Sequence, residues 1–432
     1  MDVRRTVEAV WRMESANVVV AMTRLVRDVG LAEDIAQEAF ASALQQWPVE
    51  GVPDNPAAWL MTVARRKAID TIRRERGRQE RYARLATDPL AGTGLVADPV
   101  GDAGTGVPGT ASGSAGAVGD DILALMFVAC HPVLPRQSRA ALTLRMVGGL
   151  STEEIARAFL VPTATIGQRI SRAKRTLAEA RVPFELPRQA DLPARLSAVL
   201  EVVYLIFNEG YAATSGDRWV RQDLAEEAMR LGRRLAGLLP KEPEVHGLVA
   251  LMELQASRFA ARTGPRGEPV LLADQDRSRW DRTLIAHGLA ALRRAMSLRR
   301  PLGPYTLQAA IAGCHARART FAETDWETIV ALYDALAQIA PSPVVEVNRA
   351  VALLHADGPE AALSALDAIR DDPRMARYHL YGAVRAEALQ RLGRHAEAAE
   401  ELERAAELAP TRHERALLRQ RAAAASEFPA TG

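Results

Sequence analysis

The chain has 432 residues, of which 48% are hydrophobic and 25% charged, and its formal net charge is +2. These values are ordinary for a globular protein of about two to four domains. The sequence holds no apolar run of about eighteen residues and no basic-then-apolar leader, so we expect a cytoplasmic protein with no membrane contact. Two cysteines, Cys130 and Cys314, exclude a disulfide framework. Cys130-His131 has no second Cys/His pair at zinc spacing, so we expect no metal or other cofactor.

Helix-period apolar patterns recur along the chain, and clean alternating strand patterns are absent. The commonest residues, among them Ala, Leu, Arg and Glu, are good helix formers. We therefore predict an all-α protein. Its predicted parts are a helical domain at residues 1–85, a flexible linker at 86–119, a second helical domain at 120–182 and a helical extension at 187–425.

The stretch LAEDIAQEAFASALQQW at residues 31–47 predicts an amphipathic helix. Asp34, Gln37 and Glu38 are spaced so that they share one exposed face of this helix. Another face is expected to carry Phe40, Leu44 and Trp47. The Pro-rich stretch at 48–56 predicts a loop that ends the helix.

A concentration of positive charge follows at residues 64–84, which hold nine Lys or Arg and three acids. In the expected helix the inward positions are Trp59, Val63, Ile69 and Ile72, and the outward positions include Arg65, Arg66, Arg73 and Arg74. Asp70 is expected to pair with Arg66 or Arg74 along the helix. The basic face predicts a polyanionic partner.

Residues 86–119 hold nine glycines and no Lys or Arg. Such a segment cannot bury enough apolar surface to order itself. As a flexible coil it would span roughly 30 Å. We expect it to join two independently placed domains.

The second helical domain contains a helix-turn-helix pattern. LSTEEIARAFL offers Ser151 or Thr152 as the N-cap of one helix, with acids in its first turn. VPTAT turns the chain, and IGQRISRAKRTL predicts a second helix. Its apolar stripe is Ile166, Ile170, Ala173 and Leu177, and its polar face carries Gln168, Arg169, Arg172 and Arg175. This pattern is typical of a recognition helix that enters the major groove, although a solvated basic helix is the alternative.

The last third of the chain repeats itself. Small, large and small residues precede Pro341, Pro373 and Pro410 at matching offsets, with a period of 32 to 37 residues. Twelve residues before each Pro stand Ile329, Ala361 and Ala398 in turn, and five before the second Pro stands Ala368. This predicts a degenerate tetratricopeptide-like array, whose concave face could hold a protein partner.

Taken together, the acidic helix, the basic ARRKAIDTIRR segment, the linker and the terminal helix-turn-helix resemble the extracytoplasmic-function (ECF) branch of the bacterial sigma-70 family. The resemblance covers residues 5–80 (region 2) and 120–180 (region 4). ACHPVL at 129–134 and YLIFNEGY at 204–211, ahead of a tetratricopeptide-like extension, resemble one ECF subgroup. The resemblance implies an alternative sigma factor whose partners are promoter DNA and the β and β′ subunits of RNA polymerase.

The resemblance also implies roles for single residues. Those matching the positions that dock on the β′ clamp helices are Asp34, Gln37, Glu38 and Phe40. The loop at 48–56 matches the one that captures a flipped −10 base, and residues placed at the −10 element are Trp59, Arg65, Arg66, Lys67, Arg73 and Arg74. Residues placed at the −35 element are Thr163, Thr165, Gln168, Arg169, Arg172 and Arg175. Trp59 has a core position as its alternative, and Gly167 departs from the family pattern.

YLIFNEGY allows two interpretations. Tyr204, Phe207 and Tyr211 pack inside a helix capped by Gly210, or the segment contacts the sigma regions through Tyr204, Phe207, Asn208, Glu209 and Tyr211. In the second case the extension regulates the sigma regions.

Two other classes of protein compete with the sigma factor. A one-component helix-turn-helix regulator with a sensing solenoid would explain residues 120–425, but it leaves the acidic helix and the basic segment without a role. An enzyme is not expected, because the sequence shows no Gly-rich phosphate loop, no nucleophile elbow and no metal-spaced His cluster.

Overall fold

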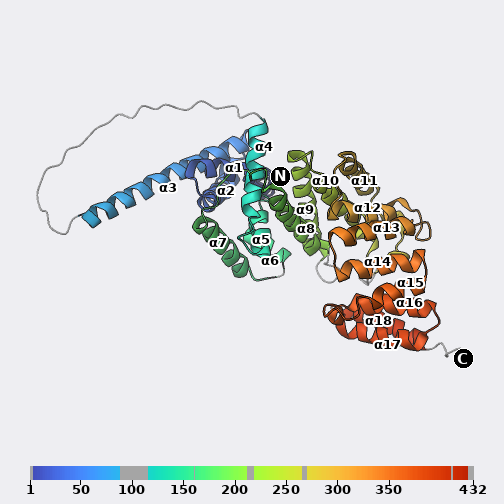
Figure 1. Cartoon of the computed structure of the whole chain (residues 1–432). Helices are drawn as coiled ribbons and strands as arrows, with labels where there is room; N and C mark the ends of the chain where they lie inside the picture. Colours follow the sequence, from blue (N-terminus) through green and yellow to red (C-terminus); the bar gives the residue numbers. More distant parts are fainter. Residues whose placement is uncertain are drawn as a thin grey trace, which may run out of the picture. The chain divides into compact units, whose positions relative to one another are not determined.

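The computed structural model describes residues 3–87, 115–159, 161–211, 218–264, 270–409 and 412–426. Every regular element in these ranges is helical, which confirms the all-α prediction (Figure 1). The chain divides into two compact units, Met1–Val203 and Tyr204–Gly432. Each unit is described by itself.

The first three helices form a small bundle. They are α1 (Val3–Val26), α2 (Val29–Glu50) and α3 (Pro56–Thr87), and each contacts the other two. The core between them is built on large apolar side chains, with Trp11, Trp47 and Leu60 almost fully buried. Asp28 caps α2 by accepting a hydrogen bond from the Leu31 amide at 2.7 Å, which fixes where this helix begins.

The next four helices form the second domain, with a helix-turn-helix at its end. They are α4 (Ala115–Ala129), α5 (Arg136–Met146), α6 (Thr152–Ala158) and α7 (Thr163–Glu179). Phe127 of α4, Leu142 of α5 and Ile155 of α6 are fully buried in its core. Ile166 of α7 joins them. The predicted helix-turn-helix is therefore present.

The two small domains pack together, contrary to the expectation that they are placed independently. Helix α1 contacts α4 and α5, and α2 contacts α7, so both domains belong to one compact unit. Helices α3 and α4 also extend into the predicted linker range, to Thr87 and from Ala115. The linker residues between them, 88–114, lie outside the described residues.

Helix α8 (Leu192–Tyr211) crosses the division between the two units. Its first half is tied to the second domain: Arg195 donates to the Phe127 carbonyl at 2.7 Å, and Glu201 pairs with Arg136 at 2.5 Å. The extension was predicted to begin at residue 187, whereas the observed division falls inside α8, after Val203. Local composition could not show these contacts, because they join residues 68 and 65 positions apart in the chain.

The second unit continues as a series of helices, each packed on the next (Figure 1). Its longer helices are α9 (Arg218–Leu238), α10 (Pro243–Ala256), α11 (Arg282–Ser297), α12 (Pro304–Arg317), α13 (Trp326–Ile339), α14 (Pro343–Ala356), α15 (Pro359–Asp367), α16 (His379–Arg391), α17 (His395–Leu408) and α18 (Arg412–Ser426). Short 3₁₀ turns are η1 (Phe259–Ala261), η2 (Leu272–Asp274), η3 (Arg277–Arg279) and η4 (Met375–Arg377). Contact between neighbours along the chain is the pattern of a helical repeat array.

The predicted repeat copies differ in quality. In the first and third copies Ile329 and Ala398 are buried, as the pattern requires. In the second copy Ala368 is exposed, because α15 ends one residue earlier, at Asp367. Pro410 lies outside the described residues. The array is thus helical throughout its described part, but its middle copy is shortened.

Candidate nucleic-acid and polymerase interfaces

The acidic face of α2 carries Asp34 and Glu38, which are both exposed. The other two predicted docking residues, Gln37 and Phe40, are less exposed. Gln37 is half-buried, and its Nε2 has no partner among the described residues. Phe40 stacks on Trp11 of α1, with ring centroids 4.8 Å apart. The exposed part of the predicted docking set is therefore the carboxylate pair.

The loop after α2 is shorter than expected. Helix α2 continues through Pro48 to Glu50, because the buried Trp47 anchors its last turn and the Gly51 amide still bonds the Trp47 carbonyl at 3.0 Å. The expected start of the loop at residue 48 is thus wrong. The remaining loop ends where Asn55 accepts a hydrogen bond from the Ala58 amide at 3.0 Å and so caps α3.

The basic face of α3 is present as predicted, with Arg65, Arg66, Arg73 and Arg74 all exposed. Lys67 differs from them, because it is half-buried and pairs with Glu38 at 3.4 Å. Asp70 forms no ion pair with either predicted partner; instead its backbone carbonyl accepts from the Arg74 side chain at 3.3 Å. The four exposed guanidinium groups form a cationic face of the kind that binds backbone phosphates.

The inward face of α3 differs from the expectation. Leu60, Ala64 and Ala68 are buried at steps of four residues, whereas Ile69 is 58% exposed. Ile69 follows the fully buried Ala68 and lies about 100° further round the helix, so its side chain faces solvent. Trp59 is half-buried and meets Trp47 edge-to-face at 5.3 Å, which supports the core alternative for this side chain.

The recognition helix is built from local signals. Ser151 and Glu154 form a reciprocal capping box at the start of α6. In α7 the predicted apolar stripe is buried at all four positions. The opposite face leaves Thr163, Gln168, Arg172 and Arg175 exposed, with Thr165 and Arg169 half-buried at its edge. This face presents polar and cationic groups to solvent, with Arg175 paired to Glu179 at 3.8 Å.

Three ionisable residues that the sequence analysis missed lie where α2 meets the helix-turn-helix domain. Glu33 of α2 is buried, and Arg145 of α5 donates to it at 2.7 Å. Lys174 of α7 also bonds Glu33, and it reaches Asp34 at 2.7 Å. The sequence does contain a sign of Glu33, since it is an acid on the buried side of an amphipathic helix. Its partners are over a hundred residues away and give no local signal.

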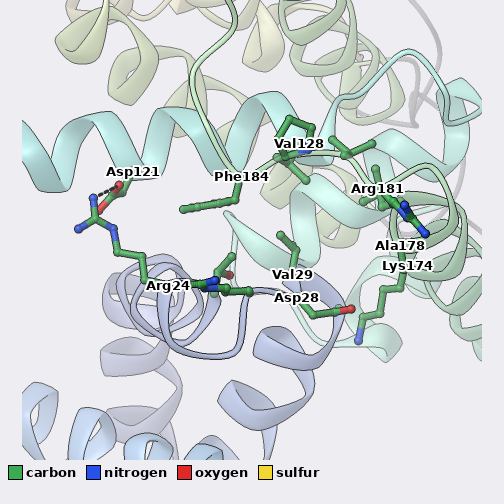
Figure 2. A pocket seen from close by; sticks show the side chains of 15 residues that line it. Arg24, Asp28, Val29, Asp121, Val128, Lys174, Ala178, Arg181 and Phe184 are labelled. Atoms are coloured by element: carbon green, nitrogen blue, oxygen red, sulfur yellow. Dashed lines mark hydrogen bonds and ion pairs between the residues drawn. The ribbon is translucent and has the colours of Figure 1, made fainter.

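A cleft of about 550 Å³ opens beside these contacts (Figure 2). Figure 2 shows the ion pair of Arg24 and Asp121, 2.6 Å long, at one end of the cleft and Lys174 and Arg181 at the other. Phe184, from the segment after α7, lies between the two groups. The cleft therefore follows the line along which the two domains meet.

The YLIFNEGY segment packs within the second unit. Phe207 is fully buried, and its ring lies 6.3 Å from that of Phe259. Tyr204 is half-buried and meets Tyr305 edge-to-face at 5.6 Å. Asn208 and Glu209 are half-buried, and the side chain of Tyr211 lies outside the described residues. Gly210 is inside α8 and does not cap it, so the packing interpretation holds for Tyr204 and Phe207.

Cys130 is an internal packing residue. Its Sγ lies 3.2 Å from the Thr143 hydroxyl, and burial raises the pKa of its thiol to about 11. In the described ranges no three His, Cys, Asp or Glu side chains gather closely enough to hold a metal ion. No described helix has the length and apolar composition needed to cross a membrane.

Comparison with known proteins matches both small domains to one family. Family models for Sigma-70 region 2 and Sigma-70 region 4 match residues 14–78 and 124–177. The ECF RNA polymerase sigma factor SigK of Mycobacterium ulcerans is 28% identical over 160 residues, 36% of this chain and 75% of that protein. The probable ECF RNA polymerase sigma factor SigI of Mycobacterium tuberculosis is 30% identical over 178 residues, 41% of this chain and 56% of that protein. The chain belongs to the ECF branch of the sigma-70 family.

Region 2 is thus the α1–α3 bundle and region 4 the α4–α7 domain. The remaining helices have other relatives. Residues 195–296 match a family of unknown function, DUF6596. An uncharacterized protein of Rhizobium meliloti is 44% identical over 411 residues, 95% of this chain and 94% of that protein. The helical extension is therefore shared, together with both sigma regions, by a protein of nearly the same length.

Proposed function

We propose that this chain is an alternative sigma factor that binds the core of RNA polymerase and directs initiation at specific promoters. The observation that supports this most strongly is that two separate DNA-facing surfaces occur on the matched sigma regions. One is the exposed arginine face of α3, and the other is the polar face of α7. A regulator with a single helix-turn-helix would need only the second.

The two surfaces suit different tasks. The α3 face carries Arg65, Arg66, Arg73 and Arg74, which fit the phosphates of the opening −10 duplex. The α7 face carries Gln168 and Arg172 at positions that suit base edges of the −35 element. Holding and reading DNA are thus divided between region 2 and region 4.

Core polymerase is proposed to dock on the exposed carboxylates of α2, Asp34 and Glu38, through its β′ subunit, while the β subunit is a further partner. The change Glu38→Lys reverses one of these charges at an exposed position. We expect it to weaken binding to core enzyme in a pull-down at low salt. Glu50→Lys, an exposed change at the end of the same helix, is the matched control. Equal binding by both variants would contradict the docking surface.

The extension is proposed to modulate the two sigma regions. It begins with α8, whose first half already holds region 4 through Arg195 and Glu201. Such a continuous helix can transmit a change in the second unit to region 4. The helical array offers a further surface for a protein partner.

A further inference from the structure

The cleft beside the contacts of Lys174 has more positive charge than its own carboxylates balance (Figure 2). Its lining includes cations and carboxylates: Arg24, Arg27, Lys174, Arg181, Asp28 and Asp121. Both carboxylates already have partners, because Asp121 pairs with Arg24 at 2.6 Å and Asp28 caps α2. Lys174 is likewise held by carboxylates of α2. Arg27 and Arg181 are therefore left without a counter-ion in the described part of the chain.

The backbone at these two arginines is unusual. Arg27 comes just after α1 and Arg181 just after α7, with φ angles of +57° and +48°. This left-handed region favours glycine, because a Cβ is crowded there. Both side chains are exposed, and an exposed cation gains little from the dipole of a helix end. An arginine at each position is thus a cost to the local backbone, which points to a use for the side chain.

The rest of the cleft suits a ring. Phe184 is half-buried and lies between the two ends of the cleft (Figure 2), and Val128, Leu177 and Val182 are also part of the lining. The volume of about 550 Å³ is that of a small-molecule site, and it cannot admit a DNA duplex. An aromatic side chain beside unpaired guanidinium groups matches a flat ring that carries phosphates.

We propose that this cleft binds a nucleotide, with its phosphates on Arg27 and Arg181 and its base against Phe184. A guanidinium group binds phosphate oxygens through paired hydrogen bonds, and an aromatic ring stacks on any base. The site goes beyond the proposed function, because it uses neither the arginine face of α3 nor the polar face of α7. Its binding can be measured on the chain alone, with no polymerase and no promoter.

Isothermal titration calorimetry of the full-length chain with ATP, GTP, CTP and UTP tests the site. Inorganic pyrophosphate is the probe for the phosphate contacts alone. We expect nucleotide binding at one site per chain. Pyrophosphate should bind about tenfold more weakly, because it gains nothing from stacking on Phe184. Phe184→Ala should reduce this difference and leave pyrophosphate binding unchanged.

Arg27→Gly and Arg181→Gly separate binding from folding. Glycine adopts a positive φ without strain, so neither variant should unfold at a lower temperature than the original chain. Each should nevertheless weaken nucleotide binding about tenfold, because a charged hydrogen-bond donor to phosphate is lost. Arg299→Gly is the matched control, since Arg299 also has a positive φ, +49°, but belongs to the second unit. It should leave the affinity unchanged.

Several results would overturn the proposal. Absence of binding for all four nucleotides at millimolar concentration would show that the cleft is not a nucleotide site. Pyrophosphate binding as tight as that of the nucleotides would leave a phosphate site with no role for Phe184. Unchanged nucleotide affinity in Arg27→Gly and Arg181→Gly would place any bound nucleotide elsewhere, such as on the basic face of α3. If these two variants weakened binding of promoter DNA instead, both arginines would belong to the DNA interface.

Discussion

Two arginines are proposed to bind DNA in different ways: Arg172 reads base edges, and Arg73 binds backbone phosphates. Both are exposed, and neither forms an ion pair among the described residues. Arg172 lies on the groove-facing side of α7, whereas Arg73 lies on α3 within the basic segment. Their different positions predict different losses when either is replaced.

We expect Arg172→Ala to cost about 1–3 kcal/mol and to relax preference at one base pair of the −35 element. Arg73→Ala should weaken binding to all promoters and reduce the slope of log affinity against log salt by about one. Fluorescence anisotropy of the holoenzyme on promoter variants, repeated over a range of salt, measures both effects. Identical losses for the two variants, independent of sequence, would contradict the division between reading and holding.

His315 of α12 is the most strongly perturbed imidazole in the second unit. Burial, reinforced by the nearby positive charges of Arg258 and Arg277, lowers its pKa to about 3. Its ring lies 5.3 Å from Trp326, edge-to-face. His315 is therefore neutral in the folded chain at pH values where it would be protonated in the unfolded chain.

The second unit should consequently lose stability as the pH falls from about 6.5 toward 3, because only the unfolded state takes up the proton. The slope from this one group is up to about 1.4 kcal/mol per pH unit. His315→Phe should flatten the dependence of the unfolding free energy on pH over this range. Urea unfolding at several pH values measures it. An unchanged slope in His315→Phe would contradict the assignment.

At the scale of the elements, the N-terminus of α12 is capped by a side chain of another helix. The Glu244 carboxylate of α10 accepts from the amides of Gly303, Tyr305 and Thr306 at 3.1, 2.8 and 3.1 Å. It also accepts from the Thr306 hydroxyl at 2.5 Å. These bonds satisfy amides at the N-terminus of α12 that have no partner within the helix. One side chain thus joins α10 to α12.

We expect Glu244→Ala to destabilise the second unit by about 1–3 kcal/mol, because several partly buried donors lose their acceptor. Glu242, two residues before Glu244, forms a surface ion pair with Arg300. Glu242→Ala removes that pair and should cost about 1 kcal/mol or less. Thermal unfolding of both variants gives the comparison. Equal losses would show that the Glu244 bonds contribute no more than an exposed pair.

Local signals in the sequence predicted some elements well. The α6–α7 pair was predictable because its capping box and its apolar stripe lie within thirty residues. The inward face of α3 was misplaced at Ile69, because the buried stripe runs through the small residues Ala64 and Ala68, whereas the larger apolar side chain lies beside it. The contact of Glu33 with Arg145 and Lys174 was not predictable, because it depends on how two domains pack.

At the scale of the whole molecule, the extension makes up about half of the chain, from Tyr204 to Gly432. A chain ending at Val203 keeps both sigma regions and the part of α8 that packs on region 4. If the extension modulates the sigma regions, this truncation should change transcription and leave −35 DNA binding in place. Full activity of the truncated chain on the same promoter would show that the extension is an appended binding module.

The YLIFNEGY segment gives a finer test of the same idea. Phe207→Ala is expected to cost about 3–5 kcal/mol, because this ring is fully buried, so it reports stability and not regulation. Asn208 is half-buried, and Asn208→Ala should preserve the fold. We expect it to reproduce part of the change in transcription caused by the truncation. Circular dichroism confirms the fold, and unchanged transcription would remove Asn208 from the regulatory surface.

Run-off transcription tests the central claim most directly, because it requires core binding, promoter reading and strand opening in one assay. Purified core RNA polymerase is combined with the full-length chain and the DNA upstream of its own coding sequence. The account predicts one transcript with a defined start that requires both proteins and is lost when Arg65, Arg66, Arg73 and Arg74 are replaced by Ala. Sequence-specific DNA binding by the chain alone, with no transcript in the presence of core enzyme, would contradict it and favour a one-component regulator.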